Sequence, residues 1–258
     1  MSWAVLLLLI LIIVRHRYYW KAKETDLFKG SLIPLMSHRG YKKKHPENTL
    51  SAFKESIKFG FLWIEIDLVS TKDNVVICSH NFDLETETDG RGYFHEIFYR
   101  DLNYLRTGIN SHTDNTKSIP SLIDVLGKVG NQVNFNFEVK TSHLFDLKTV
   151  KGLVGILKNK KSRFFMISSF SPLVIGYLKC FYPSIVTAFL VESERFLWMT
   201  NWLHPNFLNV RADMLNENLK LYSEKHNCGL IVWTVNNRKA IKFCEVFGVK
   251  SIITDLKL

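Results

Sequence analysis

From about residue 32 onward, short runs of β-prone residues alternate with longer amphipathic segments. This alternation predicts repeated strand–helix units and a parallel sheet covered by helices. We expect strands at residues 32–37, 63–68, 74–79, 133–139, 164–169, 184–189, 207–210, 229–234 and 251–254. We expect helices between these strands, for example at residues 49–59, 122–130, 172–181, 216–226 and 238–247. The 258 residues contain no linker-like shift in composition, so the chain is predicted to close into one (β/α)₈ barrel, with 74–79 as an extra hairpin arm.

The N-terminal segment has a different character. An unbroken apolar run covers residues 3–14, and Arg15, Arg17 and an aromatic cluster at 18–20 follow it. The run is short beside the ~17–25 residues of a membrane span, but it lacks the positive start and cleavage site of a signal peptide. We therefore predict that residues 1–20 form a hydrophobic helix that anchors the protein in a membrane. The basic residues after it predict that the barrel, residues 32–258, faces the cytoplasm. The alternative is a hydrophobic helix docked on the barrel, although the run has no polar face.

The net charge of +10 raises the question of a nucleic-acid partner. Lys42, Lys43 and Lys44 form a basic run, but no aromatic residues are interleaved with it as in nucleic-acid modules. We expect no nucleic-acid partner and interpret such runs as solvated faces.

Polar residues at the C-terminal ends of the expected strands are the candidates for chemistry, because (β/α)₈ barrels carry their sites there. Glu65 and Asp67 are two residues apart, so their side chains share one face of a strand. If Glu138 joins them, three hard oxygen donors surround one point, which suits Mg²⁺ or Ca²⁺. Their neighbours within residues 63–68 are apolar, so two carboxylates that are simply exposed to solvent are less expected here.

Two histidines follow expected neighbouring strands, His38 and His80. Imidazole titrates near neutral pH, so the two form a natural proton-transfer pair. Arg39 and Lys140 offer positive charge either for phosphate oxygens or for the carboxylates. Trp233 could line a pocket, stack on a quaternary ammonium group or simply fill the barrel.

These motifs, in this order, resemble the glycerophosphodiester phosphodiesterase family over roughly residues 32–255. The motifs are His38-Arg39-Gly40, Pro46-Glu47-Asn48-Thr49, Glu65-Ile66-Asp67, Thr71-Lys72-Asp73 before His80, Glu138-Val139-Lys140, Ser168-Ser169-Phe170 and Trp233-Thr234-Val235-Asn236.

The resemblance implies a TIM barrel that cleaves glycerophosphodiesters, such as glycerophosphocholine, into glycerol 3-phosphate and an alcohol. It implies that His38 and His80 are the catalytic acid and base. It also implies that a divalent cation, Mg²⁺ or Ca²⁺, is bound by Glu65, Asp67 and Glu138. The substrate-binding residues that it implies are Arg39, Glu47, Lys140 and Trp233.

Two features depart from the family pattern. Asn81 replaces an Asp after the second histidine, and the segment 84–88 lacks the usual Arg. The chain also stops soon after Asp255, so closure of the barrel could depend on the N-terminal segment or be looser than usual.

Three other functions stay open. One is a lysophospholipase D-like activity on membrane lysophospholipids, with Phe59, Phe61 and residues 196–202 as a candidate apolar track. Another is a phospholipase C-like enzyme, which the three carboxylates disfavour in its metal-free form. The last is a barrel that binds phospholipid without catalysis.

Overall fold

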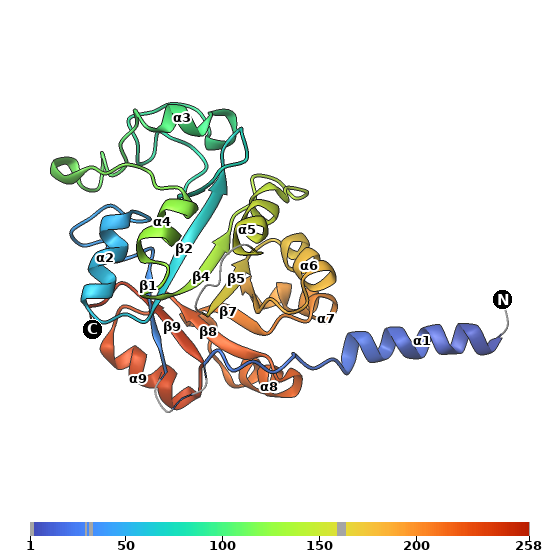
Figure 1. The fold of residues 1–258 in the computed structure, drawn as a ribbon. Coiled ribbons are helices and arrows are strands. Elements are labelled where there is room, and N and C mark those ends of the chain that lie inside the picture. Colours follow the sequence, from blue (N-terminus) through green and yellow to red (C-terminus); the bar gives the residue numbers. More distant parts are fainter. Residues whose placement is uncertain (1–2, 29, 31–32, 159–163, 258) are drawn as a thin grey trace.

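The computed structural model describes residues 3–28, 30, 33–158 and 164–257, and its ribbon is a barrel of strands surrounded by helices (Figure 1). β1 pairs with both β9 and β2, which closes the ring of eight parallel strands. The strands of the ring are β1 (Leu35–His38), β2 (Trp63–Ser70), β4 (Asn134–Val139), β5 (Phe165–Ser169), β6 (Thr187–Val191), β7 (Phe207–Arg211), β8 (Gly229–Trp233) and β9 (Ser251–Thr254). The predicted TIM-type barrel is therefore confirmed, while residue 32, the expected start of the first strand, lies outside the described residues.

Closure of the barrel does not involve the N-terminal segment. β9 pairs with β8 on one side and with β1 on the other, in register from Leu35 opposite Ile252. The predicted extra arm is β3 (Val76–Cys78), which pairs antiparallel with β2 outside the ring. The short C-terminus thus leaves the ring complete, because the last strand is already paired on both edges.

Six helices of at least eight residues cover the outside of the ring in the described part of the chain. They are α2 (Leu50–Lys58), α4 (Leu122–Val129), α5 (Lys148–Lys158), α6 (Pro172–Phe181), α8 (Glu217–His226) and α9 (Arg238–Phe247). Five of them match predicted helices, and side chains cap their starts: Thr49 accepts from the backbone N–H of Ala52, and Ser121 from that of Asp124. α5 lies between β4 and β5, where a helix was expected without stated bounds.

Alternating strand residues build two cores. Residues pointing outward pack under the helices, whereas those pointing inward, including Met36, Trp63, Phe207 and Ile231, fill the lower barrel. Phe28 closes this inner core from below, with its ring 5.1 Å from the ring of Trp63. The chemistry is therefore restricted to the upper, C-terminal end.

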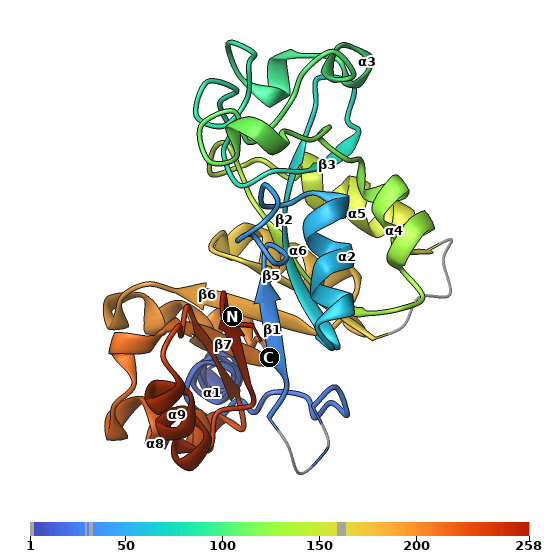
Figure 2. The ribbon, with the colours of Figure 1, turned by 90° about the vertical axis from the view of Figure 1, so that its left-hand side faces the viewer.

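A long connection between β3 and α4 covers part of that upper end. It contains η1 (Phe94–Glu96), α3 (Tyr99–Leu102) and η2 (Thr113–Asn115), and its own small core includes Leu84 and Phe94. The views in Figures 1 and 2 both place it beyond the arrowhead of β2. The chain after β6 forms η3 (Glu194–Met199) and α7 (Thr200–Leu203), and η4 (Ala212–Met214) follows β7.

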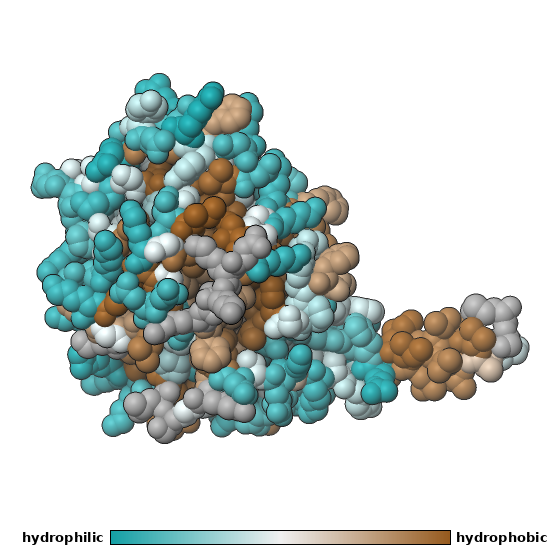
Figure 3. Space-filling view, viewed as in Figure 1, coloured by the Kyte–Doolittle hydropathy of each residue, from teal (hydrophilic) through white to brown (hydrophobic). Residues whose placement is uncertain are grey.

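The N-terminal helix α1 (Trp3–Tyr18) extends away from the barrel as an apolar rod, and none of its residues is buried (Figures 1 and 3). Sixteen residues rise only about 24 Å, less than the ~30 Å of a hydrocarbon core. Among the described residues, no helix is long and apolar enough to cross a membrane. The prediction of a membrane anchor that holds the barrel on the cytoplasmic side is therefore wrong. The division at residue 20 into two regions stays a prediction.

Candidate active site

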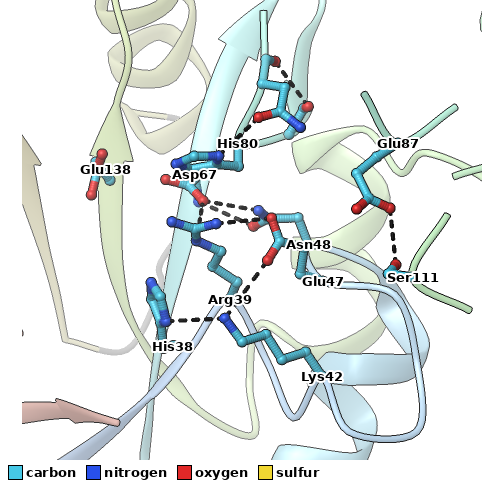
Figure 4. A network of polar contacts seen from close by, with 12 residues as sticks. His38, Arg39, Lys42, Glu47, Asn48, Asp67, His80, Glu87, Ser111 and Glu138 are labelled. Atoms are coloured by element: carbon cyan, nitrogen blue, oxygen red, sulfur yellow. Dashed lines mark hydrogen bonds and ion pairs between the residues drawn. The ribbon is translucent and has the colours of Figure 1, made fainter. Parts of the chain in front are cut away.

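The residues singled out in the sequence lie toward the C-terminal ends of the strands, and Figure 4 shows His38, Asp67, His80 and Glu138 among them. They are His38 at the end of β1, Glu65 and Asp67 on β2, His80 after β3, Glu138 on β4, Lys140 just after β4, and Trp233 at the end of β8. Residues up to 195 positions apart thus share one mouth, because parallel strands end at the same side of the ring.

Three carboxylates form the centre of the site. One oxygen each from Glu65, Asp67 and Glu138 lies within 4.8 Å of the other two, a spacing that could hold a metal ion. Glu65 and Asp67 are each 1% exposed. Glu65 Oε2 accepts a hydrogen bond from the backbone N–H of Arg39, but Glu65 Oε1 has no hydrogen-bond partner among the described residues. A buried carboxylate oxygen left unpaired is costly, and a cation would satisfy it.

The protonation of these acids reflects their burial. Burial raises the pKa of Glu65 well above its ordinary value, and the nearby Asp67 and Glu138 raise it further. Burial also raises the pKa of Glu138. Burial opposes ionisation of Asp67 as well, but Lys140 and Arg39 hold its pKa below the ordinary value. The cluster therefore carries less negative charge than three free carboxylates would.

Two cations balance the acids. Lys140 Nζ lies 3.2 Å from Asp67 Oδ1 and 2.9 Å from Glu138 Oε1. Arg39 Nε lies 3.1 Å from Asp67 Oδ2, and Arg39 Nη1 donates to Glu47 Oε1 at 2.9 Å. Both cations thus act as counter-ions in this structure, one of the two possibilities that the sequence left open.

The turn after β1 places Arg39. Its φ is 58° and that of Gly40 is 80°, both in the left-handed region. A Cβ on Gly40 would lie 2.8 Å from Ala52 Cβ, so only glycine lets the turn approach α2 so closely. The backbone N–H of Arg39 bonds back to the carbonyl of Glu65, which ties this turn to β2.

Asn48 is a supporting residue that the sequence reasoning quoted in a motif but gave no role. Its side chain donates from Nδ2 to Asp67 Oδ2 at 2.9 Å and accepts from the backbone N–H of Asp67 at 3.1 Å. Asn48 is buried and has a φ of 57°, a conformation that asparagine tolerates well. It therefore fixes the orientation of the Asp67 carboxylate.

Both histidines are held through Nδ1. His38 Nδ1 lies 2.9 Å from Asp255 Oδ1, and His80 Nδ1 lies 3.0 Å from Asn81 Oδ1. Burial, and then the charge of Lys140, lowers the pKa of His80 below its ordinary value. Asn81 thus occupies the place of the family's Asp with a neutral amide that still contacts the ring.

The connection above the site is braced by its own hydrogen bonds. Thr86 donates from its backbone N–H to Asp83 Oδ1 at 2.8 Å, and Glu87 Oε2 accepts from Ser111 Oγ at 2.9 Å (Figure 4). A cavity of about 20 Å³ lies between this connection and His80, and Glu47, Asp83 and Glu87 are among its lining residues. Glu87 and Thr88, from the segment 84–88 that departs from the family pattern, therefore line this side of the site.

Trp233 stands at the end of β8. Its Nε1 donates to the carbonyl of Asn209 at 3.2 Å, and its ring meets Phe170 edge-on at 5.8 Å between centroids. Phe170 is 41% exposed, so the pair presents an aromatic wall at the mouth. A role for Trp233 in binding substrate stays a prediction.

Two further residues join the site without having been assigned to it from sequence. Asp255 contacts His38, and Lys42 Nζ lies 3.1 Å from Asp255 Oδ1. The signal for Asp255 was present, because it directly follows the last strand at its C-terminal end. Lys42 carried no such signal within its run of three lysines.

Comparisons with known proteins agree with this geometry. The model of the "Glycerophosphoryl diester phosphodiesterase family" matches residues 38–256. The glycerophosphodiester phosphodiesterase of Caldanaerobacter subterraneus subsp. tengcongensis is 27% identical over 232 residues, which cover 86% of this chain and 93% of that protein. That of Bacillus altitudinis is 27% identical over 244 residues, covering 87% and 95%.

A solved structure shares the fold. The Oleispira antarctica phosphodiesterase in complex with the product sn-glycerol-3-phosphate superposes with a TM-score of 0.79, at 21% identity over 87% of this chain and 93% of that one. Because the family model covers most of the sequence and the barrel is complete, the chain belongs to the glycerophosphoryl diester phosphodiesterase family and is a hydrolase.

Proposed function

We propose that this protein is a divalent-metal-dependent glycerophosphodiester phosphodiesterase that releases glycerol 3-phosphate and an alcohol by acid–base catalysis with His38 and His80. The observation that carries the proposal is the buried triad of Glu65, Asp67 and Glu138, whose oxygens converge within 4.8 Å. The product bound to the Oleispira antarctica relative is in keeping with this substrate class.

The donor set fits a hard cation. All three acids offer carboxylate oxygens, the ligands that Mg²⁺ and Ca²⁺ prefer, and the unpaired Glu65 Oε1 is an oxygen that a cation would satisfy. Glu65, Asp67 and Glu138 would hold the ion. When bound, it would supply Lewis-acid stabilisation of charge on the phosphate.

The remaining steps fall to the chain's own residues. One histidine removes a proton from the attacking oxygen, and the other gives a proton to the oxygen of the departing alcohol. Each ring is contacted at Nδ1, which leaves Nε2 for proton transfer. Arg39 and Lys140, now paired with carboxylates, would exchange part of that pairing for phosphate oxygens, while Glu47 keeps Arg39 in place.

The lysophospholipid alternative loses part of its support. Phe61 is 2% exposed and lies just before β2, at the opposite end of the barrel from the carboxylates. Phe59 is the C-cap of α2, but its ring lies 4.6 Å from that of Tyr41, in the turn after Gly40. Phe61 therefore cannot line a track to the site, which leaves Phe59 and the exposed Trp198 and Trp202 as candidates from the predicted track.

The test is turnover by the purified full-length chain. We expect glycerol 3-phosphate from glycerophosphocholine in added Mg²⁺ or Ca²⁺, and none after EDTA treatment. His38→Ala and His80→Ala should each lower kcat by about 10²–10⁴-fold, the usual worth of general acid–base catalysis. Glu245→Gln, on the exposed side of α9, is the matched control and should leave kcat unchanged.

Other outcomes would identify the alternatives. Turnover that persists in EDTA would favour a phospholipase C-like route. Lysophospholipid cleavage without glycerophosphodiester cleavage would favour the lipid enzyme. No turnover across a panel of diesters would favour a non-catalytic, phospholipid-binding barrel and would contradict the proposal.

A further inference from the structure

Both oxygens of the Asp255 carboxylate, just after β9, have polar partners. Its Oδ1 lies 2.9 Å from His38 Nδ1, and its Oδ2 accepts from Asn236 Nδ2 at 2.7 Å. Its backbone N–H donates to Asn236 Oδ1 at 2.8 Å. This double contact with Asn236 fixes the plane of the carboxylate, so its contact with His38 does not depend on a freely rotating side chain.

His38 and Lys42 together keep Asp255 ionised. Lys42 Nζ lies 3.1 Å from Asp255 Oδ1 but 3.4 Å from His38 Nδ1. Burial would raise the pKa of Asp255, yet the hydrogen bond and charge of His38, followed by the charge of Lys42, hold it well below its usual range. Asp255 is therefore a carboxylate at neutral pH, able only to accept hydrogen bonds.

The ring of His38 must then donate. A neutral imidazole carries its proton on one nitrogen, and an ionised carboxylate at 2.9 Å requires that nitrogen to be Nδ1. Lys42 cannot donate to the same nitrogen, and its shorter distance to Asp255 makes the carboxylate its partner. When the ring is neutral, Nε2 on its other side is then left with its lone pair.

We propose that Asp255 is the positioning residue of His38, fixing the Nδ1–H tautomer and ring orientation that make Nε2 available to the reaction. This inference rests on the proposed function of His38, and Asp255 itself touches no reacting atom. His80 is held differently: the amide of Asn81 carries a donor and an acceptor and cannot by itself select a tautomer.

The first test is spectroscopic. In protein labelled with ¹⁵N-histidine, two-bond ¹H–¹⁵N correlations report which ring nitrogen carries the proton, and the His38 signals are those missing from His38→Gln. We expect the Nδ1–H tautomer in the native chain and a shift toward the Nε2–H form in Asp255→Asn. An Nε2–H tautomer in the native chain would overturn the proposal, whether or not any variant folds.

The second test is kinetic. Asp255→Asn keeps the shape but removes the charge, and we expect kcat for glycerophosphocholine to fall about 10- to 100-fold with KM nearly unchanged. Asp255→Glu should recover part of kcat, since it restores the carboxylate. Asp213→Asn is the control: Asp213 is an exposed acid after β7 that pairs with Arg211, and its loss should not affect kcat. Native kcat in Asp255→Asn would refute the positioning role.

Thermal unfolding of each variant separates misfolding from mispositioning, because Asp255 also joins the ends of β8 and β9 through Asn236. Failure of the proposed function has a different signature. The native chain would then show no turnover on any diester, while the tautomer of His38 could still be measured.

Discussion

At the scale of single residues, Lys179 on α6 is a largely buried cation whose hydrogen-bond partner is neutral. Its Nζ donates to Asn206 Oδ1 at 2.7 Å, a neutral partner. The pKa of Lys179 is lowered to about 8. Burial is the largest cause, Cys228 partly offsets it, and the charge of Lys23 adds to the lowering. Asn206 Oδ1 also accepts from the backbone N–H of Thr187 at 3.0 Å, so it does not depend on the lysine.

Lys179→Met is expected to stabilise the protein by about 1–2 kcal/mol near pH 7. The folded pKa lies below the ordinary value of 10.5, so the unfolded chain binds the proton more tightly. The unfolding free energy of the native chain should therefore rise as the pH increases from about 8 to about 10. This contribution of Lys179 is lost again as the pH falls through the folded pKa. Denaturant unfolding at both ends of that range measures the difference. If the unfolding free energy of Lys179→Met rose with pH as steeply as that of the native chain, this account would be excluded.

At the scale of elements, the N-terminal helix and the segment after it differ sharply. No residue of α1 is buried, whereas Trp20 and Ala22 are each 5% exposed. The Trp20 ring stacks between His204 and His226, with centroids 4.8 and 4.4 Å away. Packing on the barrel is therefore concentrated after the helix, at Trp20.

Trp20→Ala should cost about 3–5 kcal/mol of unfolding free energy, the usual range for a buried tryptophan. Trp3→Ala, at a position 87% exposed, is the matched control and should change stability by less than ~0.5 kcal/mol. Deletion of residues 1–14 should likewise leave the melting temperature of the barrel unchanged. His16, in the last turn of α1, contacts Trp202 and His204 and is kept in that variant, so a large loss would mean that the deleted part of α1 also packs on the barrel.

At the scale of the whole molecule, the fold gathers acids that repel one another. Glu65 and Asp67 come from β2 and Glu138 from β4, and the ring holds them together at the mouth. Because the folded-state pKa of Glu65 is raised, the metal-free protein loses stability as the pH rises above the ordinary value of 4.5. A bound cation would remove this penalty.

Mg²⁺ or Ca²⁺ at about 100 times its dissociation constant should add ~2.7 kcal/mol, or roughly 5–10 °C in melting temperature. EDTA should reverse the shift. Glu65→Gln should melt higher than the native chain in EDTA near pH 7, since it removes a repelling charge, and should show no response to metal. Thermal unfolding measures both effects, and an unchanged metal response in Glu65→Gln would exclude Glu65 as a ligand.

Sequence reasoning was most accurate where structure is local. The two-residue period placed Glu65 and Asp67 on one face, and β-prone runs between amphipathic segments gave the barrel. It gave no bounds for α5, whose Gly152 and Gly155 weaken the helical pattern although Val150, Leu153 and Leu157 face the core. It also predicted a membrane anchor from apolar composition, whereas the helix has only 16 residues.

By itself, the sequence determined the order of strands and helices, the barrel and which strand ends carry acids and histidines, because these depend on periodicity along the chain. Only the tertiary structure decided that Asp255 meets His38 across 217 residues and that Asn48 holds Asp67. Such contacts depend on how far each strand is shifted along its neighbour and on left-handed turns, which no local pattern encodes.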